Sequence, residues 1–169
     1  GMMNADDFYS ATMSAAFGGT TTTMSFAAQH RGMRIPDVLD EYHARAANKA
    51  VIDYAFHLIV ADPTPETLNE HLPTAIAQGV ASLKLYMTYD RLMVDDRQIL
   101  DILTTARANG ALTMVHAENH AMIGWMSDRV VDAGNTLPRY HAVCHTRGAE
   151  AEAIHRLIAL SELADTPVL

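Results

Sequence analysis

The chain has 169 residues, of which 49% are hydrophobic and 19% are charged. This composition is that of a soluble globular domain with a sizeable core, and it argues against a disordered chain. The formal net charge of −8 disfavours nucleic acid as a partner, and the single cysteine excludes an internal disulfide. No apolar run approaches the ~20 residues of a membrane span and no signal peptide is visible, so we expect no membrane association and a cytoplasmic location.

Apolar, β-branched stretches recur about every thirty residues and predict strands buried in a parallel sheet. They cover residues 20–26, 50–59, 80–87 and 111–116. Amphipathic helical patterns lie between or after them. These patterns cover residues 35–47, 65–77, 95–107, 118–133 and 150–163. Residues 166–169 predict the beginning of a further strand.

This alternation predicts βαβ units within a single domain that covers residues 1–169, where Gly1 is interpreted as the remnant of a cleaved tag. Two α/β architectures use such units: an open doubly wound sheet and a TIM (β/α)8 barrel. The pattern does not decide between them, although no GxGxxG motif follows the first strand, as it would in a dinucleotide-binding sheet. A closed barrel takes about 250 residues, so this chain would form about half of one, a partial TIM barrel.

A lysine interrupts the third predicted strand. Strand alternation places Lys84 on one face with Ser82 and Tyr86, and it places leucines on the other. A buried ammonium without a partner is costly, so this lysine either extends its stem to water or has a chemical role. Two such roles are a Schiff base with a carbonyl substrate, and carboxylation by CO2 to a carbamate that can bridge two metal ions.

Histidines end two of the predicted strands, where parallel sheets and barrels gather their chemistry. His116 is a candidate metal ligand, with a hydrogen-bonded cap as the alternative. His57 holds a similar place and is interpreted as a structural or site-lining residue. Two weaker metal candidates are the pair His116 and His120 and the cluster His141, Cys144 and His145, whose spacing differs from that of a structural zinc module.

Several segments carry residue patterns that are typical of one enzyme family. They are residues 4–12 (NADDFYSAT), 18–21 (GGTT), 49–57 (KAVIDYAFH), 82–89 (SLKLYMTY), 92–96 (LMVDD), 115–119 (VHAEN) and 150–153 (EAEA). Together they resemble the dihydropyrimidinase/D-hydantoinase family of the amidohydrolase superfamily. The likeness covers nearly the whole chain after Met3, and its most specific part is the lysine segment combined with the histidine segment.

The resemblance implies a TIM barrel with two zinc ions at its mouth. Lys84 would be the carboxylated lysine that bridges both ions, and His116 would bind one of them. Tyr89 would be the catalytic tyrosine that polarises the substrate carbonyl and stabilises its oxyanion. A metal-bound hydroxide would attack a small cyclic amide, such as dihydrouracil or hydantoin, and give the N-carbamoyl amino acid.

Parts of the family pattern have no counterpart in this sequence. The resemblance implies a His-x-His pair on the first barrel strand, a later histidine, and an aspartate on the last strand, so the chain is interpreted as a fragment that lacks the first and the last barrel strands. Zinc sites need three or four protein ligands, and we therefore expect incomplete zinc binding and an inactive isolated chain. Residues 144–148 (CHTRG) stand where the family commonly has a Ser-Arg-Pro run, which leaves the substrate preference open.

Half of a barrel would expose two strand edges and one apolar face, which predicts a homo-oligomer. Two alternatives to a hydrolase fragment stay open. One is a non-catalytic oligomerising module derived from the same family. The other is a different barrel or doubly wound hydrolase that uses Lys84 as a Schiff base. Bound zinc or a carbamate on Lys84 would favour the hydrolase over the module, and borohydride trapping would test for the Schiff base.

Overall fold

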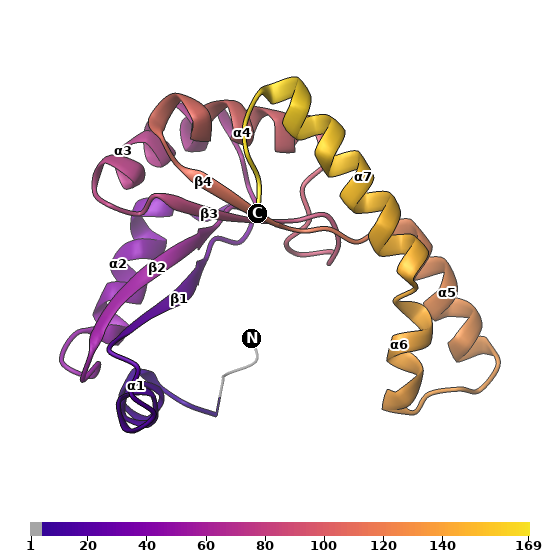
Figure 1. Cartoon of the computed structure of the whole chain (residues 1–169), viewed down its shortest axis with the longest axis horizontal. Helices are drawn as coiled ribbons and strands as arrows, with labels where there is room; N and C mark the ends of the chain where they lie inside the picture. The colour runs from indigo at the N-terminus through magenta and orange to yellow at the C-terminus, as the bar shows by residue number, and fades with distance from the viewer. Residues whose placement is uncertain (1–4) are drawn as a thin grey trace.

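Four parallel strands stand side by side in chain order, β1-β2-β3-β4, in the computed structural model, which describes residues 5–169 (Figure 1). They are β1 (Thr22–Ala28), β2 (Asp53–Ile59), β3 (Ser82–Tyr86) and β4 (Leu112–His116). Each overlaps a stretch that the sequence predicted as a strand. Val168 forms a parallel bridge with Thr113, which confirms that a further strand begins next to β4.

Helices connect the strands, and capping residues in the sequence account for where helices begin and end. They are α1 (Phe8–Phe17), α2 (Ile35–Ala46), the π-helical turn η1 (Thr67–His71), α3 (Leu72–Ala77), α4 (Asp96–Asn109), α5 (His120–Asp132), the short η2 (Pro138–Tyr140), α6 (His141–Cys144) and α7 (Arg147–Ala164). Helix α4 shows why. The Asp95 side chain caps its first turn by accepting from the backbone amide of Gln98, and Gly110 ends it in the left-handed conformation at φ 75°.

The two faces of the sheet differ in what covers them. On one face, Leu83 and Leu85 are fully buried against the helices, together with Leu58 of β2 and Leu103 of α4. On the other face, side chains such as Lys84 are only half-buried. Helices α2, α3 and α4 lie along the first face, and no described helix covers the second (Figure 1). We call this second face the open face; its exposed apolar residues are Met24, Phe26 and Leu112.

This arrangement decides between the two predicted architectures. A doubly wound sheet carries helices on both faces and reorders its strands at a switch point. Here the strands keep their chain order and the helices that flank the sheet lie on one side of it. This is the arrangement of a (β/α)8 barrel, in which all helices lie outside the ring of strands. The prediction of a partial TIM barrel is therefore confirmed.

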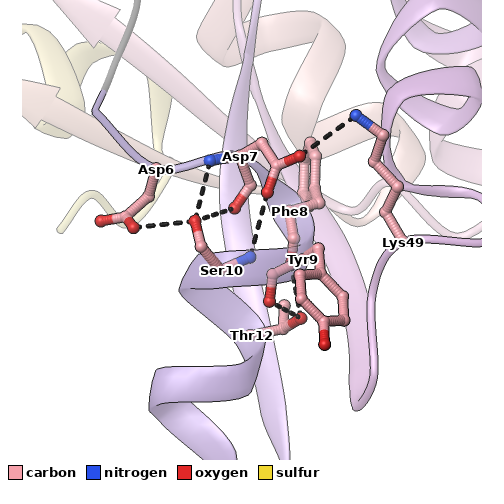
Figure 2. A network of polar contacts seen from close by, with 7 residues as sticks. All are labelled: Asp6, Asp7, Phe8, Tyr9, Ser10, Thr12 and Lys49. Carbon is pink, nitrogen blue, oxygen red and sulfur yellow. Dashed lines mark hydrogen bonds and ion pairs between the residues drawn. The ribbon is translucent and has the colours of Figure 1, made fainter.

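Polar contacts fix helix α1 against the segment that leads into β2 (Figure 2). Asp7 and Ser10 form a reciprocal capping box at the start of the helix. The Asp7 carboxylate also lies 3.2 Å from Nζ of Lys49, and the backbone amide of Ser10, followed by this lysine, lowers the pKa of Asp7. The buried Thr12 hydroxyl accepts a hydrogen bond of 3.1 Å from the backbone amide of Val51. The β1–β2 side of the sheet is therefore anchored to the helix that precedes it.

Helices α5 and α6 extend away from the sheet as a hairpin beside the beginning of α7 (Figure 1). The hairpin is mostly exposed, and Trp125 and Val131 of α5 leave more than half of their surface accessible to solvent. Nowhere in residues 5–169 does a helix combine the length and the apolar character of a membrane span.

Because only one face of the sheet is tightly packed, substitutions on the two faces should differ in their effect on the free energy of unfolding. Replacing the fully buried Leu85 by alanine leaves a cavity in the core and should lower the free energy of unfolding by about 2–5 kcal/mol. The matched change Met24→Ala, on the open face, should cost less than about 1 kcal/mol. Urea unfolding followed by circular dichroism measures both. Equal losses for the two variants would contradict the assignment of the faces.

Candidate functional site

The strand register places the predicted site residues on the same face of the sheet. Lys84 of β3 stands beside Met114 of β4, and Tyr86 stands beside His116. Because lateral neighbours in a parallel sheet point to the same side, Lys84 and His116 both project from the open face. His116 is the last residue of β4, at the carboxyl end where a barrel of this type collects functional side chains, and Lys84 is the middle residue of β3.

Lys84 stands in a partly desolvated position. Burial lowers the pKa of its ammonium, and its Nζ lies 5.0 Å from the centroid of the Tyr86 ring. The lowered pKa increases the fraction of neutral amine, which is the form that reacts with CO2 or with a carbonyl carbon. The two chemical roles that the sequence suggested for this residue both need that form, and they stay predictions.

Tyr89 lies over His116 from the loop that follows β3. Its backbone has φ 74°, a left-handed conformation that is unusual for an aromatic residue and that clusters at functional sites. The two rings lie 5.3 Å apart, and the Tyr89 hydroxyl is 3.4 Å from Nε2 of His116. Burial, followed by the charge of Glu118, raises the pKa of the phenol, so it stays protonated and able to donate a hydrogen bond.

A carboxylate that the sequence analysis did not single out connects two histidines. Glu118 Oε2 lies 2.7 Å from Nε2 of His116, and Glu118 Oε1 lies 2.8 Å from Nδ1 of His145. Burial alone would raise the pKa of Glu118, but the hydrogen bonds from both imidazoles outweigh it and hold the pKa below its usual value. Glu118 therefore ties the end of β4 to the segment before α7.

The other candidate histidines lie elsewhere. His57 Nδ1 is 2.6 Å from the Ser82 hydroxyl, and its ring packs against Phe26, so it belongs to the open face. His120 does not share a site with His116; it contacts Thr88 at 3.2 Å and Asp90 at 3.3 Å.

The cluster that the sequence suggested around Cys144 does not form a metal site among the described residues, although two of its members stay in contact. His145 binds Glu118, His141 stacks on His145 at 4.1 Å, and Cys144 is buried.

The described residues supply only some of the ligands that a zinc ion needs. Among residues 5–169, no group of three or more histidine, cysteine, aspartate or glutamate side chains is arranged to hold a metal. Lys84, as a carbamate, and His116 would offer two ligands, whereas zinc takes three or four from the protein. The described residues therefore do not complete a zinc site on their own, and zinc stays a prediction.

A cleft of about 510 Å3 lies next to these residues, along the edge of β4. Its polar lining comes from Lys84, His116, Glu118 and Glu150, and its apolar lining includes Ile154, Leu157, Ile158, Val168 and Leu169. Clefts of this size with a few convergent polar groups are typical of small-molecule sites. The arrangement can therefore receive a small, partly polar molecule beside the lysine and the histidine.

Comparison with known proteins gives a consistent result, although no protein-family model matches the chain. The D-hydantoinase of Geobacillus stearothermophilus is 40% identical over 166 residues, which are 97% of this chain and 35% of that protein. The D-hydantoinase of Streptomyces coelicolor is 41% identical over 169 residues, covering 99% and 36% of the two chains. The D-phenylhydantoinase of Escherichia coli is 42% identical over 164 residues, covering 95% and 35%.

Solved structures agree with the sequence matches. A dihydropyrimidinase from Brevibacillus agri superposes with a TM-score of 0.95 at 39% identity, covering 99% of this chain and 37% of that one. A D-hydantoinase from Bacillus sp. AR9 gives the same TM-score, identity and coverage. The chain thus spans about a third of the length of the relatives it matches.

The strand order, the helices on one side of the sheet and the superposition define a segment of a (β/α)8 barrel. At about 40% identity over nearly all of its length, the chain belongs to the D-hydantoinase/dihydropyrimidinase family and corresponds to about a third of a family member.

The Glu118 bridge predicts a pH-dependent contribution to stability. Because its pKa is lowered on folding, the carboxylate stabilises the fold at pH values above about 4.5, and this contribution is lost as the pH falls through its folded pKa. Glu118→Gln should cost about 1 kcal/mol at pH 7 and progressively less below pH ~4.5. Urea midpoints measured from pH 3 to 8 test this, with Glu150→Gln as the exposed control. A loss that does not depend on pH would contradict the bridge.

Proposed function

We propose that this chain is part of a metal-dependent hydrolase that opens hydantoin or dihydropyrimidine rings and releases N-carbamoyl amino acids. One observation carries the proposal: Lys84 and His116 share the open face at neighbouring strands, beside a cleft of suitable size. The names of the relatives support the choice of substrate class, since D-hydantoinases and a dihydropyrimidinase match along nearly the whole chain.

In this proposal Lys84 is carboxylated by CO2 and, with His116, contributes to holding zinc ions whose remaining ligands are not among the described residues. Bound zinc would supply an activated hydroxide at neutral pH. The lowered pKa of Lys84 favours the neutral amine that carboxylation requires. Glu118 accepts a hydrogen bond at Nε2 of His116 and fixes the orientation of the imidazole, as outer partners of metal ligands commonly do.

Tyr89 is the residue of this chain that we assign to the substrate carbonyl. Its phenol stays protonated because burial raises its pKa, so it can donate to an oxygen that gains negative charge during ring opening. The strained backbone at Tyr89 holds the ring over His116, which presets the position of the hydroxyl. Such a donor stabilises the oxyanion more than the ground-state carbonyl.

A second candidate, a non-catalytic oligomerising module, is favoured by one observation: no group of three or more acidic, cysteine or histidine ligands lies among residues 5–169. The two candidates differ in metal content. A chain purified with bound zinc or with a carbamate on Lys84 favours the hydrolase, and a metal-free chain that still assembles favours the module.

A chimaera separates the activity of the segment from that of the isolated chain. The matching 166 residues of the Geobacillus stearothermophilus enzyme are replaced by this chain, and hydantoin ring opening is followed spectrophotometrically. We expect turnover in the chimaera, none in its Lys84→Ala variant, and none from the isolated chain. A folded chimaera without activity, or an isolated chain with activity, would refute the corresponding part of the proposal.

The role of Tyr89 is tested in the same chimaera. Tyr89→Phe keeps the ring but removes the donor, and we expect kcat to fall by about 10²–10³ while KM changes little, because the lost interaction forms mainly in the transition state. Tyr86→Phe is the matched control, since it removes the neighbouring hydroxyl and should leave kcat within about threefold. Equal losses for both variants would count against a specific role for Tyr89.

A further inference from the structure

Tyr89 has the most unusual backbone conformation in the part of the chain that the structure describes. Three non-glycine residues of that part have a positive φ: Asn48, Tyr89 and Asp165. Asparagine and aspartate tolerate the left-handed region because their short side chains hydrogen-bond locally, whereas an aromatic residue has no such compensation. A conformation of this kind persists where the surrounding contacts hold it. The contacts on either side of Tyr89 therefore decide whether its ring stays over His116.

One side chain contacts both sequence neighbours of Tyr89. Nδ1 of His120 lies 3.2 Å from the Thr88 hydroxyl, and Nε2 of the same ring lies 3.3 Å from Oδ1 of Asp90. A neutral imidazole with its hydrogen on Nε2 can satisfy both contacts, because Nδ1 then accepts from the hydroxyl and Nε2 donates to the carboxylate. His120 therefore bridges the residue before the tyrosine and the residue after it.

The two contacts of His120 differ in their exposure to water. Thr88 is 2% exposed, so its contact with the imidazole lies in a shielded position where a lost partner is costly. The Asp90 side chain is 88% exposed, and charge pairs at such positions contribute little. We therefore expect the Thr88 contact to account for most of the effect of His120.

The backbone fixes His120 and the loop on which it acts. His120 is the first residue of α5, and the backbone amide of the preceding Asn119 donates to the carbonyl of Ala149 over 3.0 Å. At the start of the loop, the amide of Met87 donates to the carbonyl of His116, also over 3.0 Å. The imidazole therefore extends from an anchored helix start to a loop that is anchored on β4.

The carbonyl of Tyr89 closes the turn that follows it. This carbonyl accepts hydrogen bonds from the backbone amides of Leu92 and Met93, at 2.9 and 2.8 Å. Both bonds depend on the direction of the carbonyl, which the backbone angles of Tyr89 set. The protection of these two amides from exchange with solvent therefore reports on the conformation of Tyr89.

We propose that His120 is a positioning residue for Tyr89. By bridging the two neighbours of the tyrosine, its imidazole holds the left-handed backbone that keeps the phenol over His116. The effect on the backbone is independent of any activity. The effect on turnover rests on the proposed function, in which the Tyr89 hydroxyl donates to the substrate carbonyl.

Amide hydrogen exchange of the full chain, followed by NMR, tests the effect on the backbone. In His120→Ala the amides of Leu92 and Met93 should exchange at least about tenfold faster. The amide of Leu112, which is hydrogen-bonded at the start of β4, should keep its rate. Alanine is the best helix former, so the change leaves α5 intact. His155→Ala, which removes an exposed histidine of α7, is the matched control and should change none of these rates.

Two further variants separate the hydrogen bond from the bulk of the ring. His120→Asn keeps a polar atom within reach of Thr88 and should restore most of the protection. Thr88→Val keeps the shape of the threonine but removes its hydroxyl, so it should reproduce most of the effect of His120→Ala. The double variant should exchange no faster than His120→Ala, because both changes remove the same interaction.

The effect on turnover is tested in the chimaera. His120→Ala should lower kcat about tenfold and leave KM within about twofold, because the donor is displaced rather than removed. His120→Asn should recover most of the lost kcat. Combining His120→Ala with Tyr89→Phe should cost no more than Tyr89→Phe alone, a result that a merely structural role of the histidine does not produce.

Three results would overturn the proposal. Unchanged exchange of the Leu92 and Met93 amides in His120→Ala would show that the imidazole does not hold the turn. Faster exchange at Leu112 as well would assign the effect to general destabilisation. Additive losses of kcat in the double variant would separate His120 from Tyr89. An inactive unsubstituted chimaera is a failure of the hydrolase proposal instead, and the exchange measurement still decides whether His120 holds the turn.

Discussion

The alternation of side chains along β3 is the constraint on which the rest of the structure depends. Leu83 and Leu85 point into the helix-covered core, so Lys84 between them must point to the opposite face. A shift of one residue in the register would bury the ammonium among leucines and expose the leucines to water. The packing of the two leucines therefore stabilises the sheet and also places Lys84 on the same face as His116.

That placement has an energetic cost for the charged form of the lysine. Burial lowers the pKa of Lys84, which means that folding disfavours its charged form. A methionine or leucine at this position would avoid the penalty. Near this lysine lie the protonated phenol of Tyr89 and the imidazole of His116, which is held by the carboxylate of Glu118. These groups differ from an ordinary set of solvated surface side chains because burial disfavours the charged form of the lysine.

Much of this organisation follows from local sequence signals. Strand periodicity and the amphipathic pattern of residues 95–107 are local features, and they predicted the strands and the position of α4. The alternation around Lys84 likewise predicted its face. The Glu118–His145 contact was missed because it joins residues 27 positions apart and depends on how α7 returns to β4. The left-handed backbone of Tyr89 was missed because no glycine or asparagine marks it. The roles of Lys84, His116 and Tyr89 stay predictions, since they concern ligands and chemistry rather than the fold.

The central claim is that Lys84 and His116 belong to one metal site. Carbon-13 NMR of the zinc-loaded chimaera in 13C-bicarbonate tests it most directly. The account predicts a carbamate resonance that disappears in Lys84→Arg and weakens in His116→Ala, because loss of the histidine removes a ligand of the ion that stabilises the carbamate. An active chimaera without a carbamate resonance, or with one that survives Lys84→Arg, would contradict it.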